Sequence, residues 1–299
     1  MWRGDIMNYN IIEDKNKVIL EGVSDFEPVH IFECGQCFRW NKEDDGSFTG
    51  VALDRILNVK KEEDKIIFSN TNIDDFNYIW YDYFDLDRDY GKIKKELSKD
   101  DAVLDEAVKF GSGIRILNQE PFETTISFII SANNRIPRIK KSIELISERY
   151  GSFLGEYNGK KYYSFPQKEE LSKVTVEELE DCKVGFRAKY IIAASKAIAN
   201  GEIDIYNLKN LSTEEAREIL MTLKGVGPKV SNCILLFSIG KHDSFPVDVW
   251  VKRVMEYFYL KEDTNEKLIQ KYGEDKFGNL SGFAQQYLFY YARELGIGK

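Results

Sequence analysis

The sequence predicts an α+β protein, with an antiparallel β-sheet domain at residues 7–115 and a helical domain at residues 116–299. The first third of the chain holds short runs of strand-forming residues between polar turns, a pattern typical of a β-meander. From about Asp89 onward, apolar residues recur at three- and four-residue spacing, which indicates amphipathic helices. A length of 299 residues also exceeds one average domain. Strands followed by helices predict the α+β class.

The expected strands lie at residues 36–40, 47–51, 55–59 and 65–68. Polar turns at residues 44–46 and 62–64 separate them. The expected helices lie at residues 123–132, 136–150, 188–200, 212–221 and 282–295. Breaks that carry Asn, Gly or Pro separate the helices, as at residues 133–137.

Composition excludes several classes of protein. Hydrophobic residues make up 43% of the chain and aromatic residues 13%, which suffices for a large core and excludes a disordered chain. The longest apolar runs are far too short to cross a bilayer, so no membrane partner is expected. No basic-then-apolar leader opens the chain, so we expect a cytoplasmic protein, associated with the nucleoid if bacterial. Residues 1–6 precede a second methionine, Met7, and the sequence does not decide whether they are native.

Cysteine and histidine usage argues against a metal or redox cofactor. The four cysteines, in a long chain without an export signal, predict reduced thiols. Cys34 and Cys37 form a C-x-x-C pair, but no second pair follows that would complete a zinc site. The two histidines, His30 and His242, leave little for histidine-based metal or triad chemistry. We therefore expect that no such cofactor is required.

The charge distribution favours nucleic acid more than the net charge does. A net charge of −8 counts against a nucleic-acid partner at first sight. However, residues 131–141 carry four basic side chains and no acidic one. Residues 220–253 carry five basic side chains against two acidic ones. Solvated helix faces are the ordinary explanation of such clusters, and their position around a glycine turn favours phosphate contacts instead.

The segment at residues 223–233, LKGVGPKVSNC, is the most informative part of the chain. It predicts a helix, a tight turn at Gly225, Val226 and Gly227, and a second helix with Pro228 at its first position. Glycines let the backbone approach a phosphate, and the positive end of the second helix favours an anion there. A G-x-G turn between helices is common, so the turn alone is a moderate signal for phosphate binding.

Lys229 is the candidate nucleophile, and Asp248, nineteen residues later, is its candidate partner. A free lysine titrates about three units above neutral pH, and it must lose its proton to attack carbon. A helix N-terminus and partial burial both disfavour the ammonium form. Asp248 has an ordinary explanation as the N-cap of a helix running to Tyr257. Cys233 follows Lys229 by four residues and is therefore expected on the same helix face.

These motifs resemble the 8-oxoguanine DNA glycosylase/AP lyase family, a branch of the helix-hairpin-helix Gly/Pro…Asp superfamily of base-excision DNA glycosylases. The resemblance runs from about Phe32 to Ala292. Its motifs occur in order: GQCFRW at 35–40, GIRILNQEP at 113–121, SANN at 131–134, GFRAKY at 185–190, the hairpin, and GFAQ at 282–285. The chain lacks the four-cysteine cluster of the iron–sulfur branch, so no iron–sulfur cluster is expected.

The resemblance implies a bifunctional DNA N-glycosylase and AP lyase that removes 8-oxoguanine from duplex DNA, preferably opposite cytosine. Lys229 would attack the sugar C1′ and form a Schiff base, after which β-elimination nicks the strand. Asp248 would stabilise the developing positive charge or aid proton transfer. The family likeness also implies a base pocket formed by Gly35, Cys233, Phe237, Gln285 and Phe289. In it, the Gly35 carbonyl accepts the N7–H of the base, Cys233 and Phe289 sandwich the ring, and Gln285 binds its Watson–Crick edge.

The DNA contacts implied by the resemblance are Asn133, Arg138, Phe186, Arg187, Gly225, Val226, Gly227 and Trp250. Asn133 would fill the hole in the duplex with Phe186 beside it, and Arg138 and Arg187 would bond the orphaned cytosine. Family members usually have tyrosine at Phe186, and often histidine at Trp250 and methionine at Phe237. The resemblance further implies a monomer and a monovalent cation held by the backbone carbonyls of Met221, Leu223 and Val226.

Two rival functions stay open at this stage. A glycosylase of the same fold that acts on another damaged purine typically has no lysine at the position of Lys229, so that amine argues against it. A non-catalytic helix-hairpin-helix protein would bind duplex DNA without covalent chemistry.

Overall fold

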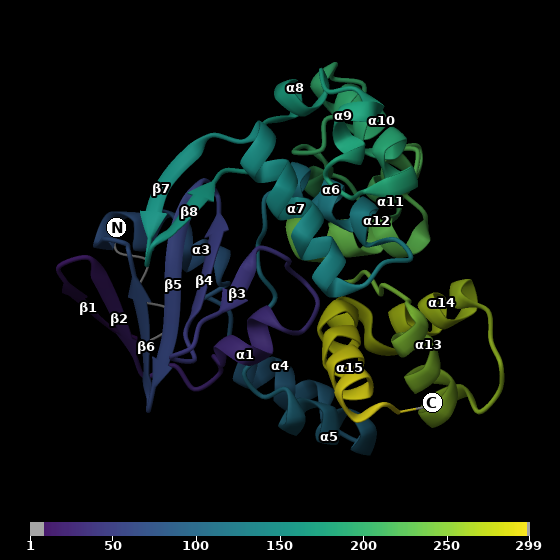
Figure 1. Ribbon diagram of the computed structural model, residues 1–299. Helices are drawn as coiled ribbons and strands as arrows, with labels where there is room; N and C mark the ends of the chain where they lie inside the picture. Colours follow the sequence, from purple (N-terminus) through teal and green to yellow (C-terminus); the bar gives the residue numbers. More distant parts are fainter. Residues whose placement is uncertain (1–8, 298–299) are drawn as a thin grey trace.

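The computed structural model describes residues 9–297 (Figure 1). The domain ends expected at residues 7 and 299, and residues 1–6, lie outside the described residues. The strands are β1 Asn10–Asp14, β2 Lys17–Glu21, β3 Trp40–Lys42, β4 Phe48–Ala52, β5 Arg55–Glu62, β6 Lys65–Ser69, β7 Phe153–Tyr157 and β8 Lys160–Tyr163.

The helices cover most of the remaining chain. The α-helices are α1 Pro28–Phe32, α2 Ile73–Asp75, α3 Tyr81–Tyr83, α4 Tyr90–Leu97, α5 Ala102–Phe110, α6 Pro121–Ser131, α7 Ile136–Tyr150, α8 Lys168–Leu171, α9 Val176–Glu180, α10 Ala188–Ala199, α11 Thr213–Met221, α12 Pro228–Ile234, α13 Val249–Met255, α14 Glu266–Phe277 and α15 Ser281–Leu295. Three π-helical segments are η2 Phe76–Trp80, η5 Leu235–Ile239 and η6 Glu256–Leu260, and three 3-10 turns are η3 Gly185–Arg187, η4 Leu208–Asn210 and η7 Gly278–Leu280.

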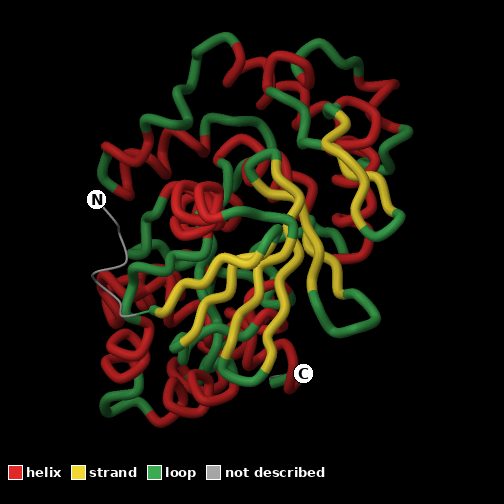
Figure 2. Tube along the Cα trace, turned by 90° about the vertical axis from the view of Figure 1, so that its left-hand side faces the viewer, coloured by secondary structure: helices red, strands yellow, loops and turns green. Residues whose placement is uncertain are grey.

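The first six strands form one antiparallel sheet in the order β1-β2-β6-β5-β4-β3. Figure 2 shows the strands of the sheet side by side, in yellow. Strands β3 to β6 are neighbours in chain order, which confirms the predicted meander. The pair β1–β2, not predicted from the sequence, extends this meander beyond β6. Residues of β1 are exposed or half-buried. Its sequence therefore lacks the alternation of apolar and polar residues that indicates a half-buried strand.

The strand expected at residues 36–40 is wrong, since only Trp40 belongs to β3. Gly35 has φ +82°, and the side chain of Gln36, which is fully buried, binds backbone instead of extending the ladder. Its Nε2 donates to the carbonyls of Ile31 (3.0 Å) and Arg115 (2.8 Å), while its Oε1 accepts the N–H of Leu117 (2.9 Å). A buried amide with several backbone partners fixes a loop conformation.

The sheet packs against α1, η2 and α3 through a core rich in aromatic side chains. Phe32 stacks on Trp40 with ring centroids 4.1 Å apart. A Cβ on Gly50 would lie 2.4 Å from the Trp40 ring, so the strand needs glycine at this position.

The helical domain buries a second, larger core that includes α6, α10, α12 and α15. All five helices expected from periodicity are present, as α6, α7, α10, α11 and α15. Buried residues of α4 and α5 also pack into this core, although they precede the boundary that we expected at residue 115. That boundary stays a prediction. The hairpin β7–β8 interrupts the helical part (Figure 1). Its Tyr162 packs on Val51 and Ile56 of the sheet.

Arg115 ties the two parts of the chain together. Its side chain is 1% exposed and lies 4.3 Å from the ring centroid of Tyr90. Its guanidinium donates to the carbonyls of Asp25, Phe84, Asp85 and Arg88 at 2.6–3.2 Å. One side chain therefore satisfies acceptors from several loops at the junction.

Replacing Arg115 with methionine should lower the free energy of unfolding by about 3 kcal/mol or more, because four carbonyls, two of them buried, lose their donor. Urea unfolding followed by tryptophan fluorescence measures this loss. The matched control is Arg149→Met, which removes an exposed arginine paired with Asp181 and should leave stability close to that of the wild type. Equal losses in the two variants would contradict the role given to Arg115.

Candidate active site

The hairpin between α11 and α12 has the geometry predicted from the sequence. Ser212 and Glu215 form a capping box that starts α11. Gly225 has φ +91°, and a Cβ there would lie 2.8 Å from Tyr190, so glycine is required twice over. Gly227 is extended and serves as the N-cap of α12, with Pro228 at the first helical position. Because of this turn, the N-terminus of α12 and its free N–H groups follow directly on the glycines.

Lys229 lies in the first turn of α12 and is half-buried. Its Nζ is 3.5 Å from Ser131 Oγ and 5.0 Å from the ring centroid of Phe128. Both of these residues lie on α6, and neither was predicted from the sequence to be part of the site. Ser131 opens the quoted SANN motif, so the motif carried a signal for it, whereas Phe128 looks like an ordinary core residue of an apolar helix.

Asp248 has the ordinary role considered for it, and its catalytic role stays a prediction. It is the N-cap of α13, and its Oδ1 accepts the N–H groups of Trp250 and Val251, both at 2.9 Å. Burial raises the pKa of its carboxyl, while the two N–H groups and the charge of Lys229 act in the opposite direction. The carboxyl that caps α13 is thus also under the influence of the Lys229 charge.

Cys233 completes this group of side chains. It is 3% exposed, one turn after Lys229 on α12. Burial raises the pKa of its thiol, the Lys229 amine lowers it, and the Asp248 carboxylate raises it. The expected face shared by Lys229 and Cys233 is thus present, and both charges act on the thiol.

The remaining residues of the expected base pocket lie on the loop after α1, on η5 and on α15. A Cβ on Gly35 would lie 3.0 Å from the Phe289 ring, so loop and helix touch at this point. Phe237 stacks on Phe128 with centroids 5.6 Å apart, and Phe128 in turn faces Lys229. Gln285 is 4% exposed, and its Oε1 is a buried acceptor with no hydrogen-bond partner among the described residues. Such an acceptor indicates a donor that arrives with a ligand.

The residues expected to enter the duplex form a second group, at the turn before α7 and at η3. Asn133 is exposed with φ +49°, a conformation that asparagine tolerates. Phe186 is 59% exposed, and the Arg187 guanidinium carbon lies 4.4 Å from its ring centroid. An exposed aromatic side chain beside an exposed asparagine suits insertion between bases.

Arg187 and Arg138 differ in how much of their hydrogen-bonding capacity is used. Arg187 is 4% exposed and donates to the carbonyls of Ala132, Asn133 and Val184 at 2.5–3.2 Å, which leaves one of its five N–H groups. Arg138 is exposed. Burial and the charge of Arg138 both lower the pKa of Arg187, so the two guanidinium groups are near one another. Arg187 thus holds the Asn133 loop, while Arg138 remains accessible.

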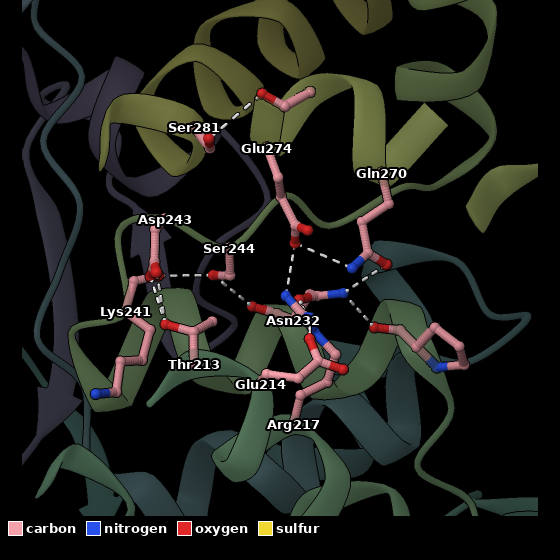
Figure 3. Close-up of polar contacts among 12 residues, drawn as sticks. Thr213, Glu214, Arg217, Asn232, Lys241, Asp243, Ser244, Gln270, Glu274 and Ser281 are labelled. Carbon is pink, nitrogen blue, oxygen red and sulfur yellow. Dashed lines mark hydrogen bonds and ion pairs between the residues drawn. The ribbon is translucent and has the colours of Figure 1, made fainter. Parts of the chain in front are cut away.

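A partly buried polar network holds α12 against the neighbouring helices (Figure 3). Arg217 of α11 is 8% exposed and donates to Asn232 Oδ1 (3.0 Å) and Glu274 Oε1 (2.5 Å). Asn232 Nδ2 donates to the Pro228 carbonyl (2.8 Å) and to Gln270 Oε1 (3.0 Å). The network joins α11, α12 and α14, and it fixes the backbone immediately before Lys229. A satisfied buried network makes the position of that helix rigid.

Within residues 9–297, no three or more His, Cys, Asp or Glu side chains are grouped so that they could hold a metal ion. The four cysteines are free thiols, all buried. The carbonyl of Leu223 accepts the Val226 N–H at 3.1 Å, and a carbonyl oxygen has a second lone pair for a cation. In the described part of the chain, no helix is both long and apolar enough to span a membrane.

The fold and the site define a helix-hairpin-helix DNA glycosylase. Two family models match the chain: the N-terminal domain of 8-oxoguanine DNA glycosylase at residues 18–125, and the HhH-GPD superfamily of base excision DNA repair proteins at residues 126–278. The chain belongs to the 8-oxoguanine DNA glycosylase family within this superfamily. It is an N-glycosylase and DNA lyase of base excision repair.

Individual relatives agree with this assignment. The N-glycosylase/DNA lyase OGG1 of Arabidopsis thaliana is 31% identical over 274 residues, which cover 86% of this chain and 75% of the relative. The 8-oxoguanine glycosylase/lyase of Clostridium acetobutylicum, solved with double-stranded DNA containing cytosine opposite 8-oxoguanine, is 49% identical with a TM-score of 0.95. That structure covers 97% of this chain and 100% of its own. MBOgg1, solved with a low-affinity DNA ligand, is 56% identical with a TM-score of 0.94, covering 97% of this chain and 100% of its own.

Gly225→Ala should lower the free energy of unfolding by about 1–3 kcal/mol, because alanine is strained at φ +91° and its Cβ would collide with Tyr190. The neighbouring glycine supplies the control. Gly227 is extended, and no atom lies within 4 Å of a Cβ placed there. Thermal unfolding should therefore show a clearly larger loss for Gly225→Ala than for Gly227→Ala, in which alanine is only a poorer N-cap than glycine. An equal loss for the two variants would refute this account of the turn.

Proposed function

We propose that this enzyme removes 8-oxoguanine from double-stranded DNA, preferably opposite cytosine, through a Schiff base on Lys229. The observation that carries the proposal is the placement of Lys229 directly after the glycine hairpin, with its Nζ 3.5 Å from Ser131 Oγ and Cys233 one helical turn further on. The charges of Lys229 and Asp248 both act on the Cys233 thiol. The similarity to a glycosylase/lyase solved with this lesion opposite cytosine supports the choice of substrate. The presence of the lysine favours it over a glycosylase for alkylated purines.

In the proposed reaction, the unprotonated Lys229 amine attacks C1′ of the extruded nucleotide. The bond from C1′ to N9 breaks, and the base leaves with its electron pair and takes up a proton. The Asp248 carboxylate lies beside the positive charge that develops on the sugar and stabilises it. The amine loses its proton, the sugar ring opens to a Schiff base, and removal of a C2′ proton expels the 3′ phosphate.

The base pocket provides the means of selection. Oxidised guanine carries an N7–H that guanine lacks, and in this proposal the Gly35 carbonyl accepts it. The unpartnered Oε1 of Gln285 accepts a donor on the Watson–Crick edge of the base. An unsatisfied buried polar group costs about 1–3 kcal/mol, so a base without the matching donor is disfavoured.

The orphaned cytosine is assigned to Arg138 and to the remaining N–H of Arg187. Cytosine offers acceptor atoms on the edge that its lost partner occupied, and the accessible Arg138 can donate to them. Asn133 and Phe186 fill the space that the extruded nucleotide leaves. In this scheme Arg187 also shapes the Asn133 loop from within.

Backbone contacts complete the proposed complex. Gly225, Val226 and Gly227 approach a phosphate at the N-terminus of α12, near Trp250. The carbonyls of Met221, Leu223 and Val226 provide oxygen ligands of the kind that a monovalent cation takes, and no other cofactor is assigned. In this proposal the enzyme acts as a monomer. We place this monomer in the cytoplasm, on the nucleoid if bacterial.

Lys229→Gln should abolish the covalent adduct that borohydride traps between the protein and a duplex containing 8-oxoguanine opposite cytosine, because the glutamine amide cannot form a Schiff base. Gel electrophoresis of the trapped complex measures this. The control is Lys224→Gln, an exposed lysine of the same hairpin, which should still form the adduct. An adduct of undiminished yield with Lys229→Gln would reject the mechanism, and a non-catalytic DNA-binding protein would give no adduct at all.

The contribution of Asp248 should disappear in acid at a higher pH than an ordinary aspartate would require, because burial raises the pKa of its carboxyl. The stabilising carboxylate is present above that pKa and is lost as the pH falls through it. The rate of base release by the wild type, divided by that of Asp248→Asn, should therefore fall towards one as the pH decreases. Single-turnover assays between pH 4 and 8 test this, and a ratio independent of pH would contradict it.

A further inference from the structure

Arg293 lies at the edge of the base pocket and has no part in the reaction described above. It follows Phe289 by four residues and Gln285 by eight, so the three side chains share one face of α15. Its Nη2 donates to the carbonyl of Glu33, two residues before Gly35. Nε and Nη2 also bind the Glu294 carboxylate, at 2.9 and 2.6 Å. Two of its three nitrogens are thus committed to protein acceptors.

The third nitrogen, Nη1, is buried and has no hydrogen-bond partner among the described residues. It lies 3.4 Å from the point where a Cβ on Gly35 would be, next to the Phe289 ring. The guanidinium carbon is 5.2 Å from the centroid of that ring. Native proteins leave few buried donors unpaired, and a guanidinium prefers charged or carbonyl acceptors. The position of Nη1 therefore indicates an acceptor that arrives with the ligand.

The order of residues along α15 matches the long axis of a purine. Successive residues of the series Gln285, Phe289 and Arg293 are about 6 Å apart along the helix axis. A base with its Watson–Crick edge on Gln285 and its ring on Phe289 directs its imidazole edge towards Arg293 and Gly35. In 8-oxoguanine this edge carries a donor, N7–H, next to an acceptor, the O8 carbonyl. The Gly35 carbonyl and Arg293 Nη1 form the complementary pair, whereas guanine offers neither group.

We propose that Arg293 is a specificity-determining residue, whose Nη1 donates a hydrogen bond to the O8 carbonyl of the extruded 8-oxoguanine. This rests on the proposed function, and it adds a second contact to the one that reads N7–H. Arg293 is also near enough to Asp248 for its positive charge to lower the pKa of that carboxyl. An effect through Asp248 alone would act on the sugar chemistry whether or not a base is present, so the two roles can be separated.

The test uses Arg293→Met and Arg293→Lys, with Arg149→Met as the matched control on an exposed arginine of α7. Three duplexes are compared under single turnover: 8-oxoguanine opposite cytosine, 8-thioguanine opposite cytosine, and a preformed abasic site. The thio base keeps N7–H and replaces O8 by a weaker acceptor. Base release is measured on the first two duplexes and strand nicking on the third.

Arg293→Met should slow release of 8-oxoguanine by about ten- to a hundredfold, the effect of losing one hydrogen bond from a charged donor. Release of 8-thioguanine should slow much less, and nicking of the abasic duplex should keep the wild-type rate. The release rate of Arg293→Lys should lie between those of the wild type and the methionine variant. Its single ammonium group must donate both to the base and to the Glu33 carbonyl, which Nη2 of the arginine binds in the wild type. If the methionine variant does not fold by circular dichroism, the lysine variant carries the same comparison.

Equal losses on both bases would overturn the proposal, since they would mean that Arg293 only holds Phe289 and the Gly35 loop in place. Slower nicking of the abasic duplex by Arg293→Met than by the wild type would also overturn it, because the effect of Arg293 would then act through Asp248 and not through the base. Undiminished release of 8-oxoguanine would show that Nη1 makes no useful contact. A wild-type protein that nicks the abasic duplex but does not release 8-oxoguanine would refute the proposed substrate, and this inference with it.

Discussion

The site depends on how the hairpin places the N-terminus of α12. Gly225 turns the chain with a positive φ and leaves room for Tyr190, so the second helix starts where α11 has just ended. Pro228 and the Asn232 amide then fix the first turn of α12, which carries Lys229. Without this turn, the amine would not lie next to Ser131 Oγ and the Phe128 ring. In the proposed mechanism, phosphate binding and catalysis therefore use the same segment of backbone.

At Asp248, the observed structural role and the proposed catalytic role are compatible. As an N-cap it accepts two backbone N–H groups, which hold its carboxylate in one orientation. The same hydrogen bonds favour the charged form of a carboxyl that burial disfavours. The N-cap role does not rule out the proposed catalytic role, because a single carboxylate oxygen, Oδ1, accepts both N–H groups.

The proposed base pocket lies where the two parts of the molecule meet. The Gly35 loop follows α1, whereas Cys233, Gln285 and Phe289 belong to the helical part. Gln286 of α15 donates to the Cys34 carbonyl at 2.7 Å, and Arg293 donates to that of Glu33. Two side chains of one helix therefore hold the loop whose carbonyl is proposed to read the base, so specificity depends on the packing between sheet and helices.

The sequence alone determined the fold class, the hairpin and the shared helix face of Lys229 and Cys233. Helix periodicity and glycine turns are local properties of the chain, so they can be recognised without the tertiary structure. It misplaced the strand at residues 36–40, where a buried Gln36 binds distant backbone, and it did not predict β1, β2 or the β7–β8 hairpin. Only the tertiary structure brought Phe128, Ser131 and Arg293 to the site. Their contacts join segments far apart in the chain, and no local pattern records which distant helix a side chain will face.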